Sequence, residues 1–166
     1  MFYGLAPLGV AHTVVSLIAV TTGLIALIRD REISPRNVVG KLYVIMTVLT
    51  CLTAFGIFQH GGFGKPHALG IVTLIVLGMA YVAGYTKLYG WASPYVETVS
   101  YSATFLFHMI PGITETTTRL PLGAPLLPSA DAPALQAASG VLFVLFLIGA
   151  TLQVLRLRAG HRRLAT

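Results

Sequence analysis

Charged residues are scarce in this chain of 166 residues. Asp, Glu, Lys and Arg together make up 10% of it, whereas a soluble globular domain contains about 25%. Hydrophobic residues make up 55% of the sequence and gather in long runs. This composition excludes an ordinary water-soluble protein. It predicts an integral membrane protein in contact with the lipid bilayer.

The sequence has one cysteine, Cys51, in the middle of an apolar run. A single cysteine excludes an intramolecular disulfide and a site built from several thiolates, so we expect a small buried apolar residue. The sequence also lacks an HExxH, CxxCH or paired CxxC motif, a Walker loop and a dinucleotide fingerprint. With no nucleophile–base pair evident, an intramembrane enzyme has the least support, and nucleotide chemistry is not expected.

Five apolar stretches are long enough to cross a membrane as helices, which takes about 20 residues. They cover residues 6–28, 40–59, 67–89, 95–118 and 134–157. The predicted fold is therefore all-α, with one transmembrane domain over residues 1–166 built as a polytopic bundle of five helices. Because the first stretch lacks a preceding basic region and a small-residue cleavage site, we expect it to be a retained span.

Basic residues predict the orientation of the bundle. Lys and Arg outnumber Asp and Glu by 11 to 5, and loops on the cytoplasmic side carry such an excess. With five spans, the first loop and the C-terminal tail fall on the same side. We therefore expect the N-terminus outside and the C-terminus in the cytoplasm, and no nucleic-acid partner. The basic residues concerned are Arg29, Arg31, Arg36 and Lys41 in the loop, and Arg156, Arg158, Arg162 and Arg163 in the tail.

The fourth stretch is less apolar than the others and carries a polar stripe. Successive helix residues turn by about 100°, so spacings of three and four place side chains on one face. Such a face must avoid lipid and point into the bundle or a wet cavity. The residues of the stripe are Glu97, Tyr101, Thr104, His108, Gly112, Glu115 and Arg119.

Four histidines fall in the outer half of the predicted bundle, namely His12, His60, His67 and His108. Together with Glu115 they are candidate ligands of a transition-metal ion. His12, His67 and His108 are also candidate ligands of a haem b iron, held from opposite sides. The alternative for each histidine is a structural hydrogen bond across the bundle. Glu115 and Arg119 are spaced for an ion pair within one helix, and Glu97 and Tyr101 can simply mark the cytoplasmic interface.

Several segments resemble a bacterial family of small predicted polytopic membrane proteins of unknown function. The segments are "HTVVSLIAVTTGLIALIRDREISPRNVVGKLYVIMTVLTCLTAFGIF", "FGKPHALGIVTL" and "HMIPGITETTTRLPLG", within residues 8–122. The resemblance implies a helical bundle with recurrent histidines in spans one, three and four, and a location in the bacterial cytoplasmic (inner) membrane. It implies no settled activity. One departure is the first basic loop, which reads Pro35-Arg36-Asn37 where the family often has a histidine.

The leading functional hypothesis is a binding protein with an outward-facing intramembrane pocket for a metal ion or haem, used in electron transfer or cofactor handling. A second is a non-catalytic accessory subunit that packs against a larger membrane complex through span five. Residues Val144 and Ile148 of that span are expected to face lipid or a partner and not the pocket. A third is a pathway for protons or small solutes along span four.

Overall fold

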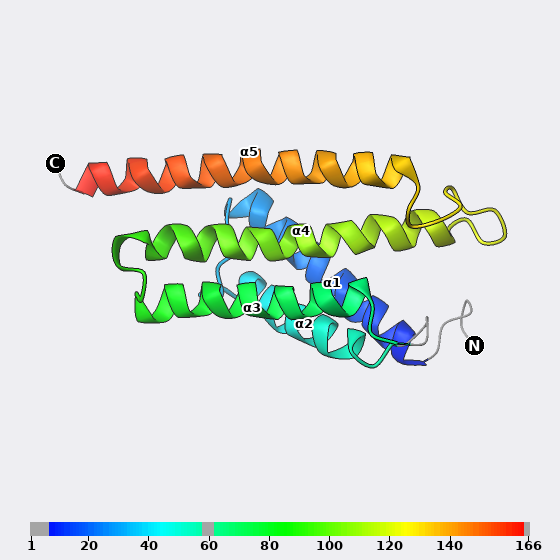
Figure 1. Ribbon diagram of the computed structural model, residues 1–166. Helices are drawn as coiled ribbons and strands as arrows, with labels where there is room; N and C mark the ends of the chain where they lie inside the picture. The colour runs from blue at the N-terminus through cyan, green and yellow to red at the C-terminus, as the bar shows by residue number, and fades with distance from the viewer. Residues whose placement is uncertain (1–6, 58–61, 165–166) are drawn as a thin grey trace.

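The computed structural model describes residues 7–57 and 62–164 of the chain, and over these ranges the protein is helical without strands (Figure 1). This confirms the all-α prediction. A short 3₁₀ turn, η1, precedes the fourth long helix. The elements are α1 (Pro7–Arg29), α2 (Val38–Ala54), α3 (Lys65–Thr86), η1 (Gly90–Ala92), α4 (Ser93–Arg119) and α5 (Pro133–Leu164).

The helices begin and end at residues with clear local causes. Asn37 caps α2, because its side-chain oxygen accepts a hydrogen bond from the Gly40 amide at 2.8 Å. Residues 56 and 57 make shorter-range backbone bonds, to Thr53 and Ala54, so α2 ends about a turn earlier than the sequence predicts. Pro66 stands in the first turn of α3, where a missing amide hydrogen does no harm.

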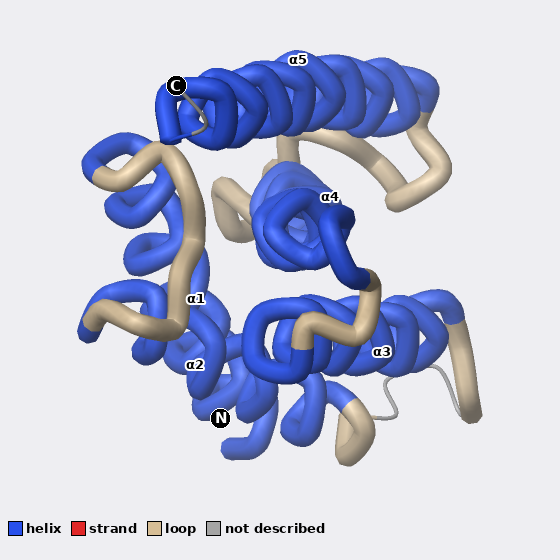
Figure 2. Tube along the Cα trace, turned by 90° about the vertical axis from the view of Figure 1, so that its left-hand side faces the viewer, coloured by secondary structure: helices blue, strands red, loops and turns tan. Residues whose placement is uncertain are grey.

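Helix α4 is the centre of the bundle. It contacts α1, α3 and α5, while α2 pairs with α1 and α3. The end-on view shows α4 between α5 on one side and α1, α2 and α3 on the other (Figure 2). Successive helices run in opposite directions, so the bundle has two distinct ends. We call them the N-end, where α1 begins and α4 ends, and the basic end, where residues 30–37 connect α1 to α2.

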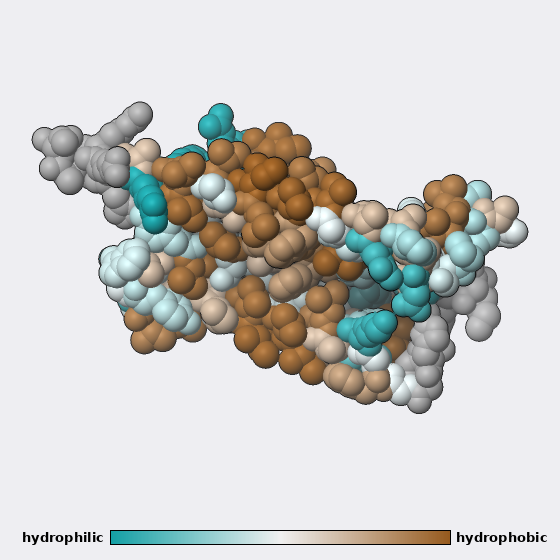
Figure 3. Space-filling model, turned by 45° about the horizontal axis from the view of Figure 1, so that its top comes forward, coloured by the Kyte–Doolittle hydropathy of each residue, from teal (hydrophilic) through white to brown (hydrophobic). Residues whose placement is uncertain are grey.

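Three of the helices are long and apolar enough to cross a membrane, namely α1, α3 and residues 133–160 of α5. Helix α2 is apolar but has 17 residues. Helix α4 is long enough, but its polar stripe lowers its hydropathy. The space-filling view shows hydrophobic residues over the middle of the molecule and hydrophilic ones toward its ends (Figure 3). The protein therefore has the surface of a membrane-embedded helix bundle in contact with lipid.

The polar stripe of α4 points into the bundle in its middle section, as predicted. Tyr101 and Thr104 are fully buried and His108 is 7% exposed. The side chains that α4 turns inward are thus those that lipid would tolerate least. The polarity that makes α4 the weakest span by hydropathy is explained by its central position.

Small residues of α1 allow close helix packing. A Cβ atom on Gly23 would lie 2.7 Å from the Phe105 ring of α4 and 2.9 Å from the Tyr43 ring of α2. Ala19 is fully buried on the same face. This face packs against two helices at once, as small-residue faces do in membranes.

Helix α5 lies on α4 and leaves its other side open. Its polar anchor is Gln153, which accepts from the Ser102 hydroxyl at 2.9 Å and donates to the Arg31 carbonyl at 2.9 Å. Val144 and Ile148 are 54% and 53% exposed. As expected, these two residues face outward, toward the place that lipid or a partner would take.

Candidate functional site

A cavity of about 230 Å³ lies between α1, α2, α3 and α4 toward the N-end. One histidine of α1, and one histidine and one carboxylate of α4, reach it, which the sequence predicted for this part of the bundle. Cys51 lines it too and is buried, as expected for a small apolar residue. Among the lining residues are His12, Thr50, Cys51, His108, Gly112 and Glu115.

His12 is held from α2. Its Nδ1 atom lies 2.9 Å from the Thr53 hydroxyl oxygen. The Thr53 hydroxyl itself donates to the Leu49 carbonyl of the same helix at 2.8 Å. Because a hydroxyl has one hydrogen, the imidazole must donate from Nδ1. The Nε2 atom of His12 is then left with a lone pair.

His108 is held the same way by a neighbouring polar side chain. Its Nε2 atom lies 3.0 Å from the Thr47 hydroxyl of α2, and its ring meets the Tyr43 ring edge-on at 6.1 Å. Both groups are buried. The hydrogen bond connects residues 61 positions apart in the sequence and joins α2 to α4 across the core.

A second buried hydrogen bond joins α2 to α4 beside it. Thr104 donates to the Tyr101 carbonyl at 2.7 Å, so Tyr43 donates to Thr104 at 2.8 Å. The Thr47 hydroxyl oxygen can accept from Nε2 of His108, and in that tautomer the lone pair of the ring is on Nδ1.

Glu115 stands at the mouth of the cavity. Its Oε2 atom lies 2.5 Å from Nε of Arg119, in the ion pair that their spacing predicted. The Glu115 side chain is 58% exposed, in contrast to His108. Glu115 thus lines the cavity while one of its oxygens pairs with Arg119.

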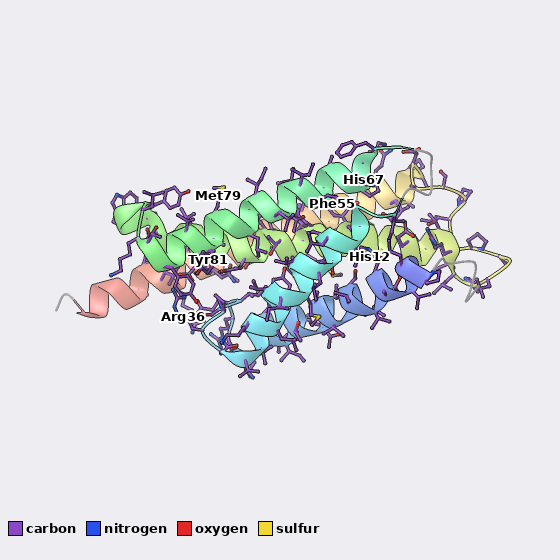
Figure 4. The ribbon with its side chains drawn as sticks, turned by 90° about the horizontal axis from the view of Figure 1, so that it is seen from below. His12, Arg36, Phe55, His67, Met79 and Tyr81 are labelled. Atoms are coloured by element: carbon purple, nitrogen blue, oxygen red, sulfur yellow. The ribbon has the colours of Figure 1, made fainter. Side chains whose placement is uncertain are left out.

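His67 does not join His12 and His108, with which the sequence analysis grouped it as a candidate ligand. It is buried in the first turn of α3, where its Nδ1 accepts the Gly64 amide at 3.2 Å and its ring packs on Phe63. It does not line the cavity. Figure 4 shows His67 and His12 toward the same end of the molecule but on different helices. His60, the remaining predicted ligand, lies outside the described residues.

Glu97 belongs to the opposite end of the bundle. It binds Arg36 of the α1–α2 loop through both oxygens, at 2.5 and 3.2 Å. Arg36 also donates to the Gly84 carbonyl at 3.0 Å and lies over the Tyr85 ring. This hydrogen-bonded pairing raises the pKa of Arg36. The α4 stripe is thus continuous in sequence but serves separate polar sites, and the interface alternative for Glu97 fits its position.

Sequence reasoning missed Tyr43 and Thr47, which orient His108. The signal was present, because they precede Thr50 by seven and three residues and so share its face of α2. Threonine in an apolar helix is easily assigned to a bond with its own backbone, and Thr47 shows that it can also hold a partner from another helix.

In the described part of the chain, no three His, Cys, Asp or Glu side chains are gathered as a metal site. A metal ion in the cavity would therefore begin with the imidazoles of His12 and His108. Both groups line it, and in each ring a threonine holds one nitrogen and leaves the other for a ligand. Two nitrogen ligands of this kind suit Zn²⁺, Cu²⁺, Ni²⁺ or iron.

No protein-family model, curated protein or solved structure matches this chain. The resemblance to a family of small membrane proteins stays a prediction.

Proposed function

We propose that this protein is a membrane-embedded binding protein whose N-end cavity takes a transition-metal ion through His12 and His108. The observation that carries the proposal is the matched chemistry of the two rings. Each ring has one nitrogen hydrogen-bonded to a threonine of α2, which leaves the other nitrogen to a ligand in the same cavity. Metal-ligating histidines are held by outer hydrogen bonds in the same way.

The size of the cavity favours an ion over a haem. Its volume is about 230 Å³, below the range of about 300–1,000 Å³ typical of pockets for drug-sized ligands. Water and Glu115 would complete the coordination of an ion. The carboxylate lines the cavity and also pairs with Arg119.

The proposal includes five membrane-crossing helices, with the N-terminus outside and the C-terminus in the cytoplasm of a bacterial cell. The alternating helix directions support it, because they place the start of α1 and the end of α5 at opposite ends. The arginines of the α1–α2 loop and of the end of α5 then lie on one side, as the distribution of basic residues requires. The cavity opens toward the other side, where an ion would be taken up or released.

Metal binding by the purified protein tests the proposal. We expect elemental analysis and titration with Zn²⁺ to give one ion per chain. His12→Ala and His108→Ala should each weaken Zn²⁺ binding by more than the about 10–100-fold that loss of an outer hydrogen-bond partner causes. His67→Ala is the matched control, because His67 is buried near the same end but does not line the cavity. Equal loss in all three variants, or a Soret band in place of a metal, would contradict the proposal.

A second candidate function is proton transfer along α4. It is favoured by two buried hydrogen bonds between α2 and α4 beside the cavity, one from His108 to Thr47 and one from Tyr43 to Thr104. In proteoliposomes with a pH gradient, Tyr43→Phe would then slow proton flux, because it removes the hydroxyl that donates to Thr104. If liposomes with the wild-type protein show the same proton flux as empty liposomes, this function is excluded.

A further inference from the structure

A second cavity lies at the basic end, between the α1–α2 loop and α5. Its volume is about 530 Å³ and its lining is polar. Four arginines line it, together with the carboxylates of Asp30 and Glu32, and Glu97 pairs with one of the arginines, which leaves an excess of one positive charge. The arginines are Arg29, Arg31, Arg36 and Arg156.

Two of these arginines keep their charge available. Arg29 is paired with Asp30 at 2.7 Å, and Arg36 is paired with Glu97. Arg156 donates to the backbone carbonyl of Asp30 at 2.8 Å, which positions its guanidinium without neutralising it. Arg31 has no ion pair within the described ranges and is exposed. The cavity therefore combines fixed guanidinium groups with uncompensated charge, the chemistry that binds phosphate.

An apolar groove begins where this basic cavity ends. It has a volume of about 220 Å³ and runs between α1 and α5 over α4. Leu27 and Gln153 line the groove, and Arg29 and Arg156, two and three residues further along the same helices, line the basic cavity. Its floor is formed by Phe105 and other residues of α4. The polar cavity and the apolar groove are thus neighbours along both walls.

The length of the groove corresponds to one leaflet of a bilayer. On α5 its lining extends from Leu142 to Gln153, a distance of about 16 Å at 1.5 Å per residue. The hydrocarbon core of a membrane is about 30 Å thick. An acyl chain that starts at the basic end would therefore remain beside the groove through its half of the membrane.

We infer that the basic cavity and the groove together form a binding site for an anionic phospholipid. The phosphate would lie among Arg31, Arg156 and their neighbours, and one acyl chain would fill the groove between α1 and α5. Charge complementarity selects the headgroup, because a zwitterionic lipid would bring a positive group toward the arginines. The lipid would also close the gap between α1 and α5, which make no direct helix contact.

Native mass spectrometry of the purified protein tests this inference. The protein is incubated with equal amounts of phosphatidylglycerol and phosphatidylcholine that carry the same acyl chains. We expect bound phosphatidylglycerol to predominate. The ratio of bound phosphatidylglycerol to bound phosphatidylcholine should fall about fivefold in Arg31→Gln and about fivefold in Arg156→Gln. The control variants Lys41→Gln and Arg158→Gln remove the same charge outside the cavity, and they should preserve the selectivity.

A groove variant separates a lipid from a free phosphate. A Cβ atom on Gly149 meets no other atom within 4 Å, so Gly149→Leu can place its side chain in the groove that Gly149 lines. We expect this variant to lose bound lipid. Gly140→Leu, at an equally open glycine of α5 outside the groove, should retain it.

Three outcomes would overturn the inference. The first is equal binding of the two lipids by the wild-type protein. The second is loss of selectivity in the control variants as well, which would mean diffuse attraction to the whole surface. The third is lipid binding that survives Gly149→Leu and is displaced by inorganic phosphate, which would mean a phosphate site without a place for the acyl chain.

Discussion

The Nε2 atom of His108 lies 3.0 Å from the hydroxyl oxygen of Thr47, in a hydrogen bond across the centre of the bundle. This bond occupies one ring nitrogen and leaves Nδ1 as the nitrogen that a ligand in the cavity could use. A threonine of α2 therefore orients a histidine of α4 beside the cavity.

The first prediction removes that hydroxyl. Thr47→Val keeps the shape of the side chain and should lower the free energy of unfolding by about 1 kcal/mol, as loss of one hydrogen bond between membrane helices does. It should also weaken Zn²⁺ binding by about 10–100-fold, because the His108 ring loses its orientation. Thermal unfolding in detergent and Zn²⁺ titration measure the two effects. If the variant is destabilised but binds Zn²⁺ as tightly as the wild-type protein, His108 is not a ligand of the metal.

The second prediction concerns the pair formed by Arg36 and Glu97. The Arg36 side chain is 52% exposed, but that of Glu97 is 13% exposed. Removing the arginine leaves a carboxylate largely shielded from water. Arg36→Ala should therefore destabilise the protein more than Glu97→Gln does, and both changes together should destabilise it less than their sum. Unfolding of the four proteins of this double-mutant cycle gives the coupling. Additive effects would show that the contact contributes nothing to stability.

The third prediction concerns acid stability at the basic end. The hydrogen bond from Arg29 to Asp30 holds the pKa of this carboxyl below its ordinary value of 3.8. A lowered pKa in the folded state contributes stability above the ordinary value, and the contribution is lost as the pH falls through the lower one. The wild-type protein should thus lose stability relative to Asp30→Asn when the pH is lowered below about 4. Melting curves of the two proteins at neutral and at acidic pH measure this change. An equal difference in melting temperature at both pH values would contradict the prediction.

The helical architecture and the cavity histidines could be predicted, because both follow from the spacing of polar and apolar residues along the helices. Residues three and four apart on α4 face inward together, and alternating helix directions bring His12 and His108 to one level. Periodicity alone does not say how far apart two residues of one face lie. Glu97 and Glu115 share a face but are 18 residues apart, about 27 Å at the helical rise, so one pocket cannot hold both.

His67 shows a second limit of the sequence. Its place at the start of α3 suggested a ligand, but a histidine in the first turn can also accept a backbone amide, as it does from Gly64. The choice depends on how α3 is rotated about its axis, which its nearly uniform apolar sequence does not specify. The hydropathy of α4 was similarly ambiguous, because a polar central helix and a poor membrane span have the same composition.

The last prediction tests the close packing of α1 through a pair of glycines. Gly23→Val would bring a side chain against the Phe105 and Tyr43 rings, because even its Cβ atom would lie within 3 Å of them. Both neighbours are bulky, and Tyr43 is fully buried and fixed by its bond to Thr104. Relief requires a shift of α1, and overpacking of this kind destabilises by about 1–3 kcal/mol. Gly78→Val on α3 is the control, because a Cβ atom there meets no atom within 4 Å. Thermal unfolding in one detergent should show a lower midpoint for the Gly23 variant and little change for the Gly78 variant. Because the Tyr43 ring also packs edge-on against His108, the Gly23 variant should lose Zn²⁺ affinity. Equal behaviour of the two variants would contradict the packing described for α1.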